Sequence, residues 1–290
     1  ARAILAANDR GGYTVPTDRL YPFQWNWDSA FVAMGWATFD AARGWREIER
    51  LLEGQWEDGL VPQIVFHAPS DDYFPGPEVW GVEHAPPTSG IPQPPVLATA
   101  VRFVLERQGP AGIERARATY PKLVRNHLWW ERARDPERSG LVATLHPWET
   151  GMDNSPAWDA ALDRVPTETT TEIRRRDIGH VDAAFRPRGI EYQRFIHLVD
   201  LFRETGWKAR RMLEISPFKI ADVGTNAILL RAERDLLALA EQFGDGGECA
   251  AIAERIARKE TVLAGLWDEA LGHYLSRDLI GGHLIPIRTS

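Results

Sequence analysis

The feature that most limits the fold of this chain is a series of long stretches in which apolar residues recur at helical spacing. Such spacing places the apolar side chains on one face of an α-helix. Short breaks such as "AARG" and "RQGPAG" separate neighbouring stretches, which is typical of helical hairpins. The seven expected helices cover residues 27–42, 44–57, 94–108, 112–134, 189–206, 222–243 and 247–268, and the few strand signals lie at 60–67, 141–146 and 274–280.

These patterns predict an all-α protein. Residues 222–243 begin at Asp222, a residue that favours helix caps, and carry apolar positions on two faces, so we expect this helix to be buried between neighbours. No repeat of roughly 30 to 45 residues is visible, which disfavours a regular solenoid and leaves a ring of hairpins, an α/α barrel, as the alternative. The chain has 290 residues, 44% of them apolar, and we expect one domain over residues 1–290.

Charge and cysteine content limit the partners and the compartment. The net charge is −7, and the arginines are scattered among acidic residues, so nucleic acid is an unexpected partner. The single cysteine, Cys249, cannot form an internal disulfide, which fits a reducing compartment. Since no apolar run suits a membrane span or a signal peptide, we expect a cytoplasmic protein without membrane contacts. No cofactor is expected, and a homo-oligomer is compatible with the sequence.

Three loops are longer than a connection between helices requires, namely residues 10–26, 58–93 and 146–189. Long structured loops in a compact domain are usually functional. Each loop precedes an expected helix, so in a helical ring the three could converge on one mouth.

Tryptophan is unusually frequent, with 12 residues. An indole offers a flat apolar face and one N–H donor, which suits the apolar face of a sugar ring, although packing alone explains most tryptophans. Those in loop-like stretches are Trp25, Trp27, Trp80, Trp148 and Trp158, whereas Trp129, Trp130 and Trp207 lie in amphipathic stretches and are expected in the core.

The stretch "YPFQWNWDS" combines aromatic faces with hydrogen-bonding groups, as a polyhydroxylated ring requires. The candidate residues are Tyr21, Gln24, Trp25, Trp27 and Asp28. The alternative for Asp28 is a helix cap.

The loop "HPWETGMDNSPAWD" offers a candidate proton donor, Asp153. Gly151 permits backbone angles that a β-carbon forbids, and Pro156 prevents a helix from crossing the loop. Tryptophans on both sides could desolvate Asp153 and raise its pKa. The alternative is an Asx turn. Glu149 and Asp159 are expected to support the loop or cap a helix.

The stretch "FRPRGIEYQRF" offers Arg186, Arg188, Tyr192 and Arg194 as a clamp for a small carboxylate, or as a solvated basic face. The run "RRR" at 174–176 is expected to be a solvated or interface cluster. The histidines show no metal-binding spacing, so no metal is expected. A non-hydrolytic sugar epimerase would need two bases, for which His67 and His197 are the candidates, but nothing in their local sequence supports them.

Four motifs in order, "QWNWDSAF", "WEDGLVPQIVFH", "TSGIPQPP" and "HPWETGMDNSPAWD", resemble inverting α-glycosidases of glycoside hydrolase family 63 and the related trehalases. Within that family the chain is similar to the bacterial mannosylglycerate and glucosylglycerate hydrolases. The resemblance implies an (α/α)6 barrel that acts without a metal, with Asp153 as general acid. It also implies a sugar subsite at Tyr21, Trp25, Trp27 and Asp28, and a glycerate end at Tyr73, Gln93, Arg186 and Tyr192. Trp148, one of the loop tryptophans, is a further candidate for substrate binding.

One part of the family pattern is missing. The general base of the family is a glutamate in an aromatic-rich stretch, and "LWDEALGHY" with Glu269 matches a helix end rather than that motif. Together with one more at the N-terminus, the seven helices are fewer than the twelve of such a barrel. The chain therefore resembles the first two-thirds of the enzyme, with a barrel incomplete at its C-terminus. The alternatives are a trehalase-like or other α-glucosidase acting on neutral oligosaccharides, and a non-catalytic sugar-binding protein.

Overall fold

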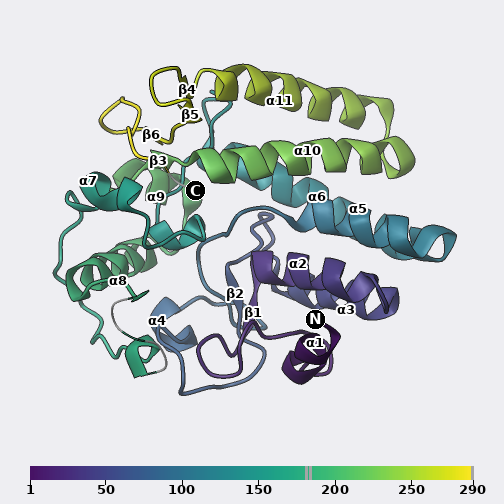
Figure 1. Ribbon diagram of the computed structural model, residues 1–290, viewed down its shortest axis with the longest axis horizontal. Helices are drawn as coiled ribbons and strands as arrows, with labels where there is room; N and C mark the ends of the chain where they lie inside the picture. Colours follow the sequence, from purple (N-terminus) through teal and green to yellow (C-terminus); the bar gives the residue numbers. More distant parts are fainter. Residues whose placement is uncertain (180–181, 183–184, 289–290) are drawn as a thin grey trace.

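The computed structural model describes residues 1–179, 182 and 185–288, and most of its long helices lie side by side (Figure 1). Helix α2 packs against α3 and α5, α5 packs against α10, and α10 packs against α6 and α11. Aliphatic side chains and Trp45 fill the space between these helices. Their bounds are α2 Asn26–Ala37, α3 Ala41–Leu51, α5 Leu97–Gln108, α6 Ile113–Arg134, α10 Val223–Phe243 and α11 Gly246–Ala264.

Aspartate side chains begin three of these helices. Asp222 accepts hydrogen bonds from the backbone N–H groups of Gly224 and Thr225, which confirms the predicted cap of α10. Asp40 caps α3 and Asp245 caps α11 in the same way. Each cap satisfies N–H groups that have no partner within the helix.

Each of the seven predicted stretches contains a helix, but three of them end early. The second helix, α3, stops at Leu51, and a 3-10 turn over Leu52–Gly54 follows. The first helix stops at Ala37, because the chain turns at Thr38 and Asp40 then caps α3. The last helix stops at Ala264, after which the chain enters a short strand. An N-terminal helix is present as α1 Arg2–Asn8. The short helices α4 Pro77–Trp80, α7 Asp159–Leu162 and α9 Ala209–Ile215 were not predicted, since so few turns show little periodicity.

In the described part of the chain, β-structure is limited to short antiparallel pairs. They are β1 Gln24–Trp25 with β2 Ile64–Val65, β3 Ile220–Ala221 with β6 Arg277–Asp278, and β4 Trp267–Asp268 with β5 His273–Tyr274. The prediction of a strand at 141–146 was wrong, because side chains take its N–H groups: Val142 donates to the Asn226 amide and Leu145 to the Glu149 carboxylate. Only Thr144 forms an isolated bridge, with Ile220.

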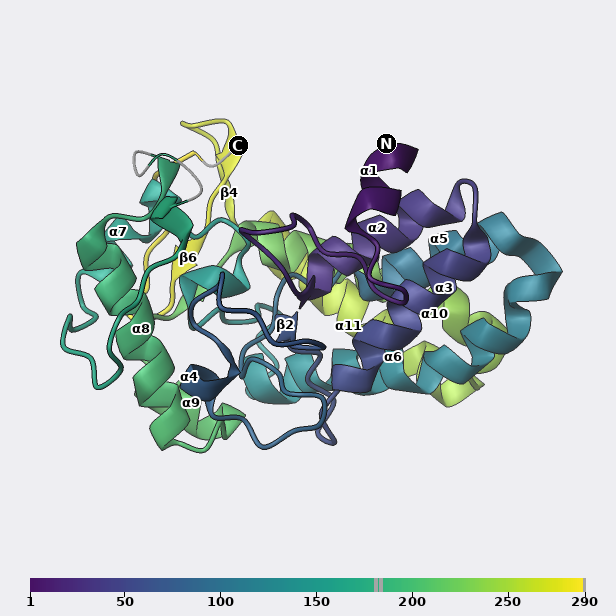
Figure 2. The ribbon, with the colours of Figure 1, turned by 90° about the horizontal axis from the view of Figure 1, so that it is seen from below.

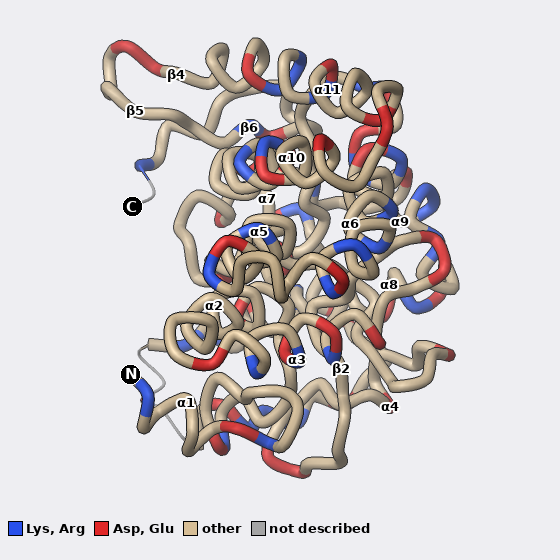
Figure 3. The backbone as a smooth tube through the Cα atoms, turned by 90° about the vertical axis from the view of Figure 1, so that its right-hand side faces the viewer, with Lys and Arg blue, Asp and Glu red and all other residues tan. Residues whose placement is uncertain are grey.

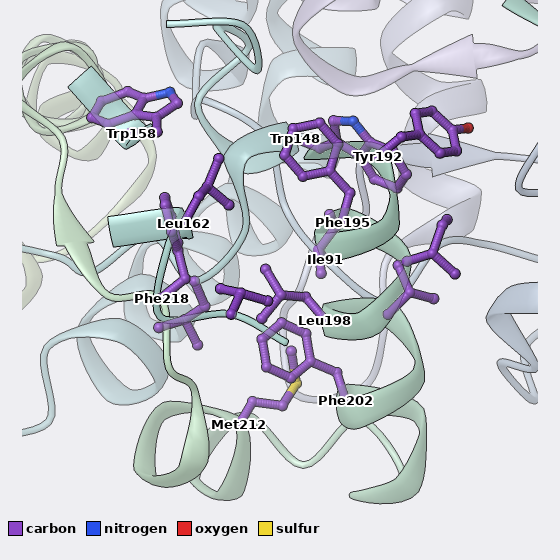
Figure 4. Packing of buried hydrophobic residues seen from close by; sticks show 14 of the residues in the cluster. Ile91, Trp148, Trp158, Leu162, Tyr192, Phe195, Leu198, Phe202, Met212 and Phe218 are labelled. Carbon is purple, nitrogen blue, oxygen red and sulfur yellow. The ribbon is translucent and has the colours of Figure 1, made fainter. Parts of the chain in front are cut away.

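Helix α8, Gly189–Glu204, lies at the other end of the molecule from α2, α3 and α5, with the long loops between them (Figure 2). It presents Tyr192, Phe195, Leu198 and Phe202 to a second core, in which Trp148 lies against Tyr192 and Phe195 (Figure 4). The loops are therefore held between two cores.

Acidic and basic residues are interspersed along the helices (Figure 3). Many form local ion pairs, such as Arg210 with Glu214 on α9 and Arg102 with Glu106 on α5. Across the residues that the structure describes, no helix combines the length and the apolar character that crossing a membrane would require.

Candidate active site

The three long loops meet at a pocket of about 220 Å³. Helix α2 contributes residues of its first turn, and α8 contributes Tyr192 from its N-terminal turn. Ten of the site residues predicted from the sequence line this pocket, namely Tyr21, Trp25, Trp27, Asp28, Tyr73, Gln93, Trp148, Asp153, Arg186 and Tyr192. The remaining lining residues are Pro16, Leu20, Gln63, Asp72, Phe74, Gly151, Asp177 and Pro187.

The first turn of α2 is fixed by bonds from two other loop segments. The Asn26 N–H donates to the carbonyl of Gln63 over 2.9 Å, and its side-chain amide donates to the carbonyl of Val61 over 3.1 Å. The Trp27 N–H donates to the Oε1 atom of Gln93 over 3.3 Å. These bonds occupy free N–H groups of the helix and set the position of the indole of Trp27 in the pocket wall.

Asp28 follows in the same turn. It is inside α2, whose N-cap is Trp25, so the alternative that Asp28 caps the helix is wrong. Burial raises the pKa of Asp28 to about 6, while hydrogen bonds from its own backbone and from the Trp27 side chain oppose this shift. A partly buried carboxylate for which the described residues provide no ion pair is costly for the free protein, and a ligand with hydroxyl donors would relieve that cost.

Aromatic rings form much of the wall. The ring of Trp25 meets Tyr21 and Tyr73 edge to face, each with centroids 5.2 Å apart. On the other side, Trp148 meets Tyr192 edge to face at 6.1 Å, as seen in Figure 4. The Tyr192 hydroxyl donates to the carbonyl of Phe74 over 2.9 Å, so this wall is tied to the loop that carries Tyr73.

Asp153 enters the pocket from a tightly held loop. The N–H of Met152 donates to the Thr150 hydroxyl over 2.9 Å, and its carbonyl accepts from the indole N–H of Trp158 over 2.8 Å. Burial raises the pKa of the Asp153 carboxyl; its own backbone amide and then Arg186 oppose this shift, and Asp177 adds to it. Asp153 therefore keeps its proton to a higher pH than an ordinary aspartate, as a general acid requires.

The other two carboxylates of this loop do not line the pocket. Glu149 is fully buried and accepts from Arg134 over 2.8 Å and from the N–H of Leu145 over 2.9 Å, which ties the loop to the end of α6. Asp159 is exposed at the start of α7. The position of Glu149 agrees with the supporting role predicted for it, whereas Asp159 does not cap α7, whose N-cap is Trp158.

A guanidinium closes one end of the pocket. Arg186 donates to the Asp177 carboxylate over 2.9 Å and to the Tyr21 hydroxyl over 3.0 Å. Although burial acts to raise it, hydrogen bonds from Arg175 and Arg186 hold the pKa of Asp177 below its usual range. Arg175 also lies over the ring of Tyr192, 4.4 Å from its centroid. Arg186 is thus a fixed cation at a half-buried position, suited to an anionic ligand group.

The structure corrects two predictions about arginines. Arg175 is not a solvated member of the "RRR" run, because its bonds to Asp177 and its contact with Tyr192 build it into the wall of the site. Arg188 and Arg194 do not line the pocket. Arg188 pairs with Glu191 in the capping box of α8, and Arg194 pairs with Asp163 over 2.8 Å.

The residues suggested for an epimerase do not meet. The ring of His67 bonds the Gln24 amide over 2.7 Å, and burial lowers its pKa to about 4. His197 bonds the carbonyl of Glu168 over 2.6 Å, and neither histidine lines the pocket. Gln24 was a candidate for sugar binding, but it is fully buried and donates to Glu47. His180 lies outside the described residues.

Some of the tryptophans line the pocket, and others are buried in the core. Trp25, Trp27 and Trp148 line the pocket, whereas Trp80 and Trp158 are fully buried and serve packing, although both came from loop-like stretches. The core positions predicted for Trp129, Trp130 and Trp207 are confirmed. Within the described ranges, no cluster of three or more histidine, cysteine, aspartate or glutamate residues is arranged to hold a metal ion.

Sequence reasoning missed three polar residues that line the pocket, Gln63, Asp72 and Asp177, and also Arg175, which contacts Asp177 and Tyr192. Asp177 carried a signal, since it is a single carboxylate directly after three arginines and before the predicted clamp residue Arg186. Gln63 carried none, because its loop and strand context resembles that of many buried glutamines.

Comparison with known proteins adds independent evidence on the family of this chain. Residues 21–290 match the model of the mannosylglycerate hydrolase MGH1-like glycoside hydrolase domain. The chain is 49% identical over 292 residues to mannosylglycerate hydrolase MGH1 of Selaginella moellendorffii, with 100% of the chain and 60% of the relative covered. It is 50% identical over 292 residues to mannosylglycerate hydrolase of Thermus thermophilus, with 99% of the chain and 70% of the relative covered.

A solved structure is also similar. The crystal structure of the GH63 mannosylglycerate hydrolase from Thermus thermophilus in complex with Tris and D-glycerate aligns with a TM-score of 0.94 and 49% identity. That alignment covers 99% of the chain and 69% of the crystallised protein. The chain thus spans 60% of the length of the Selaginella relative and about two-thirds of the crystallised one.

Proposed function

The chain belongs to the mannosylglycerate hydrolase MGH1-like glycoside hydrolase domain family, and on that premise we propose that the protein hydrolyses an α-hexosyl-glycerate with inversion at the anomeric carbon. Mannosylglycerate is the first candidate substrate, because both relatives at 49% and 50% identity carry that name, and glucosylglycerate is the second. One observation carries the proposal: Asp153, with its raised pKa, shares a pocket with the fixed guanidinium of Arg186.

In this proposal Asp153 donates its proton to the glycosidic oxygen as the bond from that oxygen to the anomeric carbon breaks. Glycerate leaves as the alcohol, and a water attacks the anomeric carbon from the opposite face. A second carboxylate takes the proton of that water, and the two carboxyl groups of an inverting enzyme lie roughly 6.5–9.5 Å apart.

The second carboxylate is the part of this mechanism that the pocket does not provide. Two guanidinium groups hold Asp177 as an ion pair, which leaves it a poor proton acceptor, and Asp28 is assigned to the hexose below. Asp72 also lines the pocket, but it is exposed to solvent, and no hydrogen bond to its carboxylate is found among the described residues. Glu269 does not line the pocket. We therefore propose that the general base is not among residues 1–290.

We assign the hexose to the part of the pocket formed by Trp25, Trp27, Asp28 and Trp148. Indole faces cover the apolar side of the ring, and the carboxylate accepts hydrogen bonds from hydroxyl groups. The glycerate is assigned to the end formed by Tyr73, Gln93, Arg186 and Tyr192, where the carboxylate of the glycerate meets the guanidinium of Arg186. Tyr21 lies between the two parts, since its hydroxyl accepts from Arg186 while its ring contacts Trp25.

We also propose an architecture for the protein. Residues 1–290 form one domain and build part of an (α/α)6 barrel, with the pocket at one mouth. The support is the helix-rich structure, its similarity to GH63 structures and the convergence of three loops before helices. The proposed reaction uses neither a metal ion nor a cofactor.

The experiment is a hydrolysis panel with the intact protein, in which NMR follows the anomer of the released hexose. The substrates are mannosylglycerate, glucosylglycerate and trehalose. We expect hydrolysis of a hexosylglycerate with the β-anomer appearing first. Initial release of the α-anomer would refute inversion. Trehalose hydrolysed better than either glycerate conjugate would favour the neutral-substrate alternative, and binding without hydrolysis would favour a sugar-binding protein.

A further inference from the structure

The wall of the pocket contains a buried amide without a complete set of hydrogen bonds. Gln63 is 5% exposed, and its side chain lines the pocket. Its Oε1 atom has no hydrogen-bond partner in the part of the chain that the structure describes. Buried polar groups are nearly always paired in folded proteins, so a pocket-lining amide whose oxygen has no partner is a candidate contact for a ligand or a water.

The position of this amide is fixed by its backbone. The N–H of Gln63 donates to the carbonyl of Ile91 over 2.6 Å, and its carbonyl accepts from the N–H of Asn26 over 2.9 Å. The next residue, Ile64, pairs with Trp25 in the β1–β2 ladder. The side chain therefore starts from a rigid point directly beside the first turn of α2.

Other glutamines near this region have partners. Gln93 accepts from the N–H of Trp27, and Gln24 donates to Glu47. Gln55 donates to the carbonyls of Gly59 and Lys122. The unpaired oxygen of Gln63 is thus a property of its place in the pocket rather than of glutamines in this fold.

The surroundings select the chemistry of the missing partner. Gln63 is bonded to Asn26, which directly precedes Trp27 and Asp28, whereas Arg186 is held by Tyr21 and Asp177. The charge of the nearby Asp28 would repel a carboxylate at this place. A hydroxyl group can form a hydrogen bond with a side-chain amide and carries no charge.

We propose that Gln63 is a specificity-determining residue of the hexose subsite, with its side-chain amide forming a hydrogen bond with one hydroxyl group of the sugar ring. This inference rests on the proposed function. It adds a contact on the sugar itself, separate from the proton donor and from the arginine that is assigned to the glycerate.

The test compares Gln63→Met with the wild type in the intact protein, on hexosylglycerates that each lack one ring hydroxyl. Methionine has a similar size but no amide. We expect the variant to lower kcat/KM on the complete substrate by about tenfold to a hundredfold. On one deoxy analogue we expect a similar loss for the wild type and no further loss for the variant, because the same contact is already absent.

The matched control is Gln55→Met, since the side chain of Gln55 is bonded to main-chain carbonyls outside the pocket. We expect its kcat/KM to stay at the wild-type value. We also expect the unfolding temperature of Gln63→Met not to fall, because the variant removes an unpaired buried polar atom. A loss below threefold on the complete substrate, or an equal loss on every deoxy analogue, would overturn the inference.

A crystal structure of the wild-type protein soaked with free mannose gives a readout that depends on neither folding of a variant nor turnover. We expect a sugar hydroxyl within hydrogen-bond distance of the Gln63 side-chain amide. A pocket in which no hydroxyl reaches this amide would contradict the inference. If the wild type hydrolyses no hexosylglycerate, the proposed function fails, and the soaked crystal still decides the role of Gln63 in sugar binding.

Discussion

Gly151 lies so close to Trp27 that a β-carbon on the glycine would be 2.5 Å from two carbons of the indole ring. Its φ of +70° is also in the region that favours glycine. The loop that carries Asp153 is therefore seated directly on the first turn of α2. This contact sets the distance between the proposed proton donor and the indole that we assign to the sugar.

The substitution Gly151→Ala should move the loop that carries Asp153 away from the indole of Trp27. We expect a destabilisation of about 1–3 kcal/mol from backbone strain and steric overlap, together with a loss of kcat/KM as the loop moves. Thermal unfolding and steady-state kinetics on a hexosylglycerate would measure both. The control is Gly11→Ala, where φ is +82° but nothing lies within 4 Å of the added carbon. It should lose some stability and no activity; equal kinetics in both variants would contradict the proposed contact.

Asp153→Asn removes the proposed proton donor and keeps its size. We expect kcat to fall by about 10²–10⁴-fold, since that is the usual contribution of general acid catalysis, while the dissociation constant of the substrate changes little. Steady-state kinetics and calorimetric titration would test this. Asp159→Asn, on an exposed carboxylate of the same loop, should behave as wild type. Retention of wild-type turnover by Asp153→Asn would rule out the assignment.

The charge of Arg186 should be visible in the pH profile. Asp153 acts in its protonated form, so kcat/KM falls as the pH rises through its pKa. Arg186 holds that pKa lower than burial alone would set it. We expect Arg186→Gln to move this alkaline limb to higher pH.

A neutral aryl α-hexoside is the suitable substrate for this measurement, because it separates the pKa effect from the loss of carboxylate binding. Arg188→Gln, which removes an exposed arginine paired with Glu191, should leave the limb in place. A shift to lower pH in Arg186→Gln would contradict the electrostatic role given to this arginine.

Asp28 should lower the stability of the free protein above about pH 6. Its pKa is raised from 3.8 to about 6 on folding, so the folded state binds more protons between these values. Stability therefore falls as the pH rises through this window, and the cost is complete above it. We expect Asp28→Asn to raise the free energy of unfolding by about 1–3 kcal/mol above the window, with the gain shrinking toward its lower end.

Urea unfolding at several pH values would follow this change, with the exposed Asp71→Asn as control. We also expect Asp28→Asn to weaken binding of a hexosylglycerate. A gain in stability that does not depend on pH would show that the carboxylate is not the cause.

The helices could be predicted from the sequence because each repeats its pattern over several turns. The ends could not, since Thr38 and Asp40 act through local hydrogen bonds that leave the apolar pattern unchanged. The strand expected at 141–146 failed for a similar reason. Its apolar residues are buried as predicted, but Asn226 and Glu149, one of them 84 residues away, take the N–H groups of Val142 and Leu145.

The site, too, could be predicted only in part. Loop length, glycine and tryptophan content, and the family motifs predicted residues that lie together in one pocket. Gln63 and Arg175 were missed because their roles depend on residues that are distant in the sequence. Gln24 was wrongly predicted to bind sugar, because its chemistry suits a sugar but its side chain is hydrogen-bonded to Glu47. Residue type indicates what a side chain can do, and its neighbours in space decide whether it is free to do so.

The hydrogen bond between Arg186 and Tyr21 joins residues 165 positions apart. Closing so long a segment costs conformational entropy before the contact returns any stability. The helical hairpins, whose partners are close in sequence, can form without it. We therefore expect the pocket to appear late in refolding, after most of the helical signal has returned, and a chain ended before Arg186 during synthesis to contain helices but no binding site.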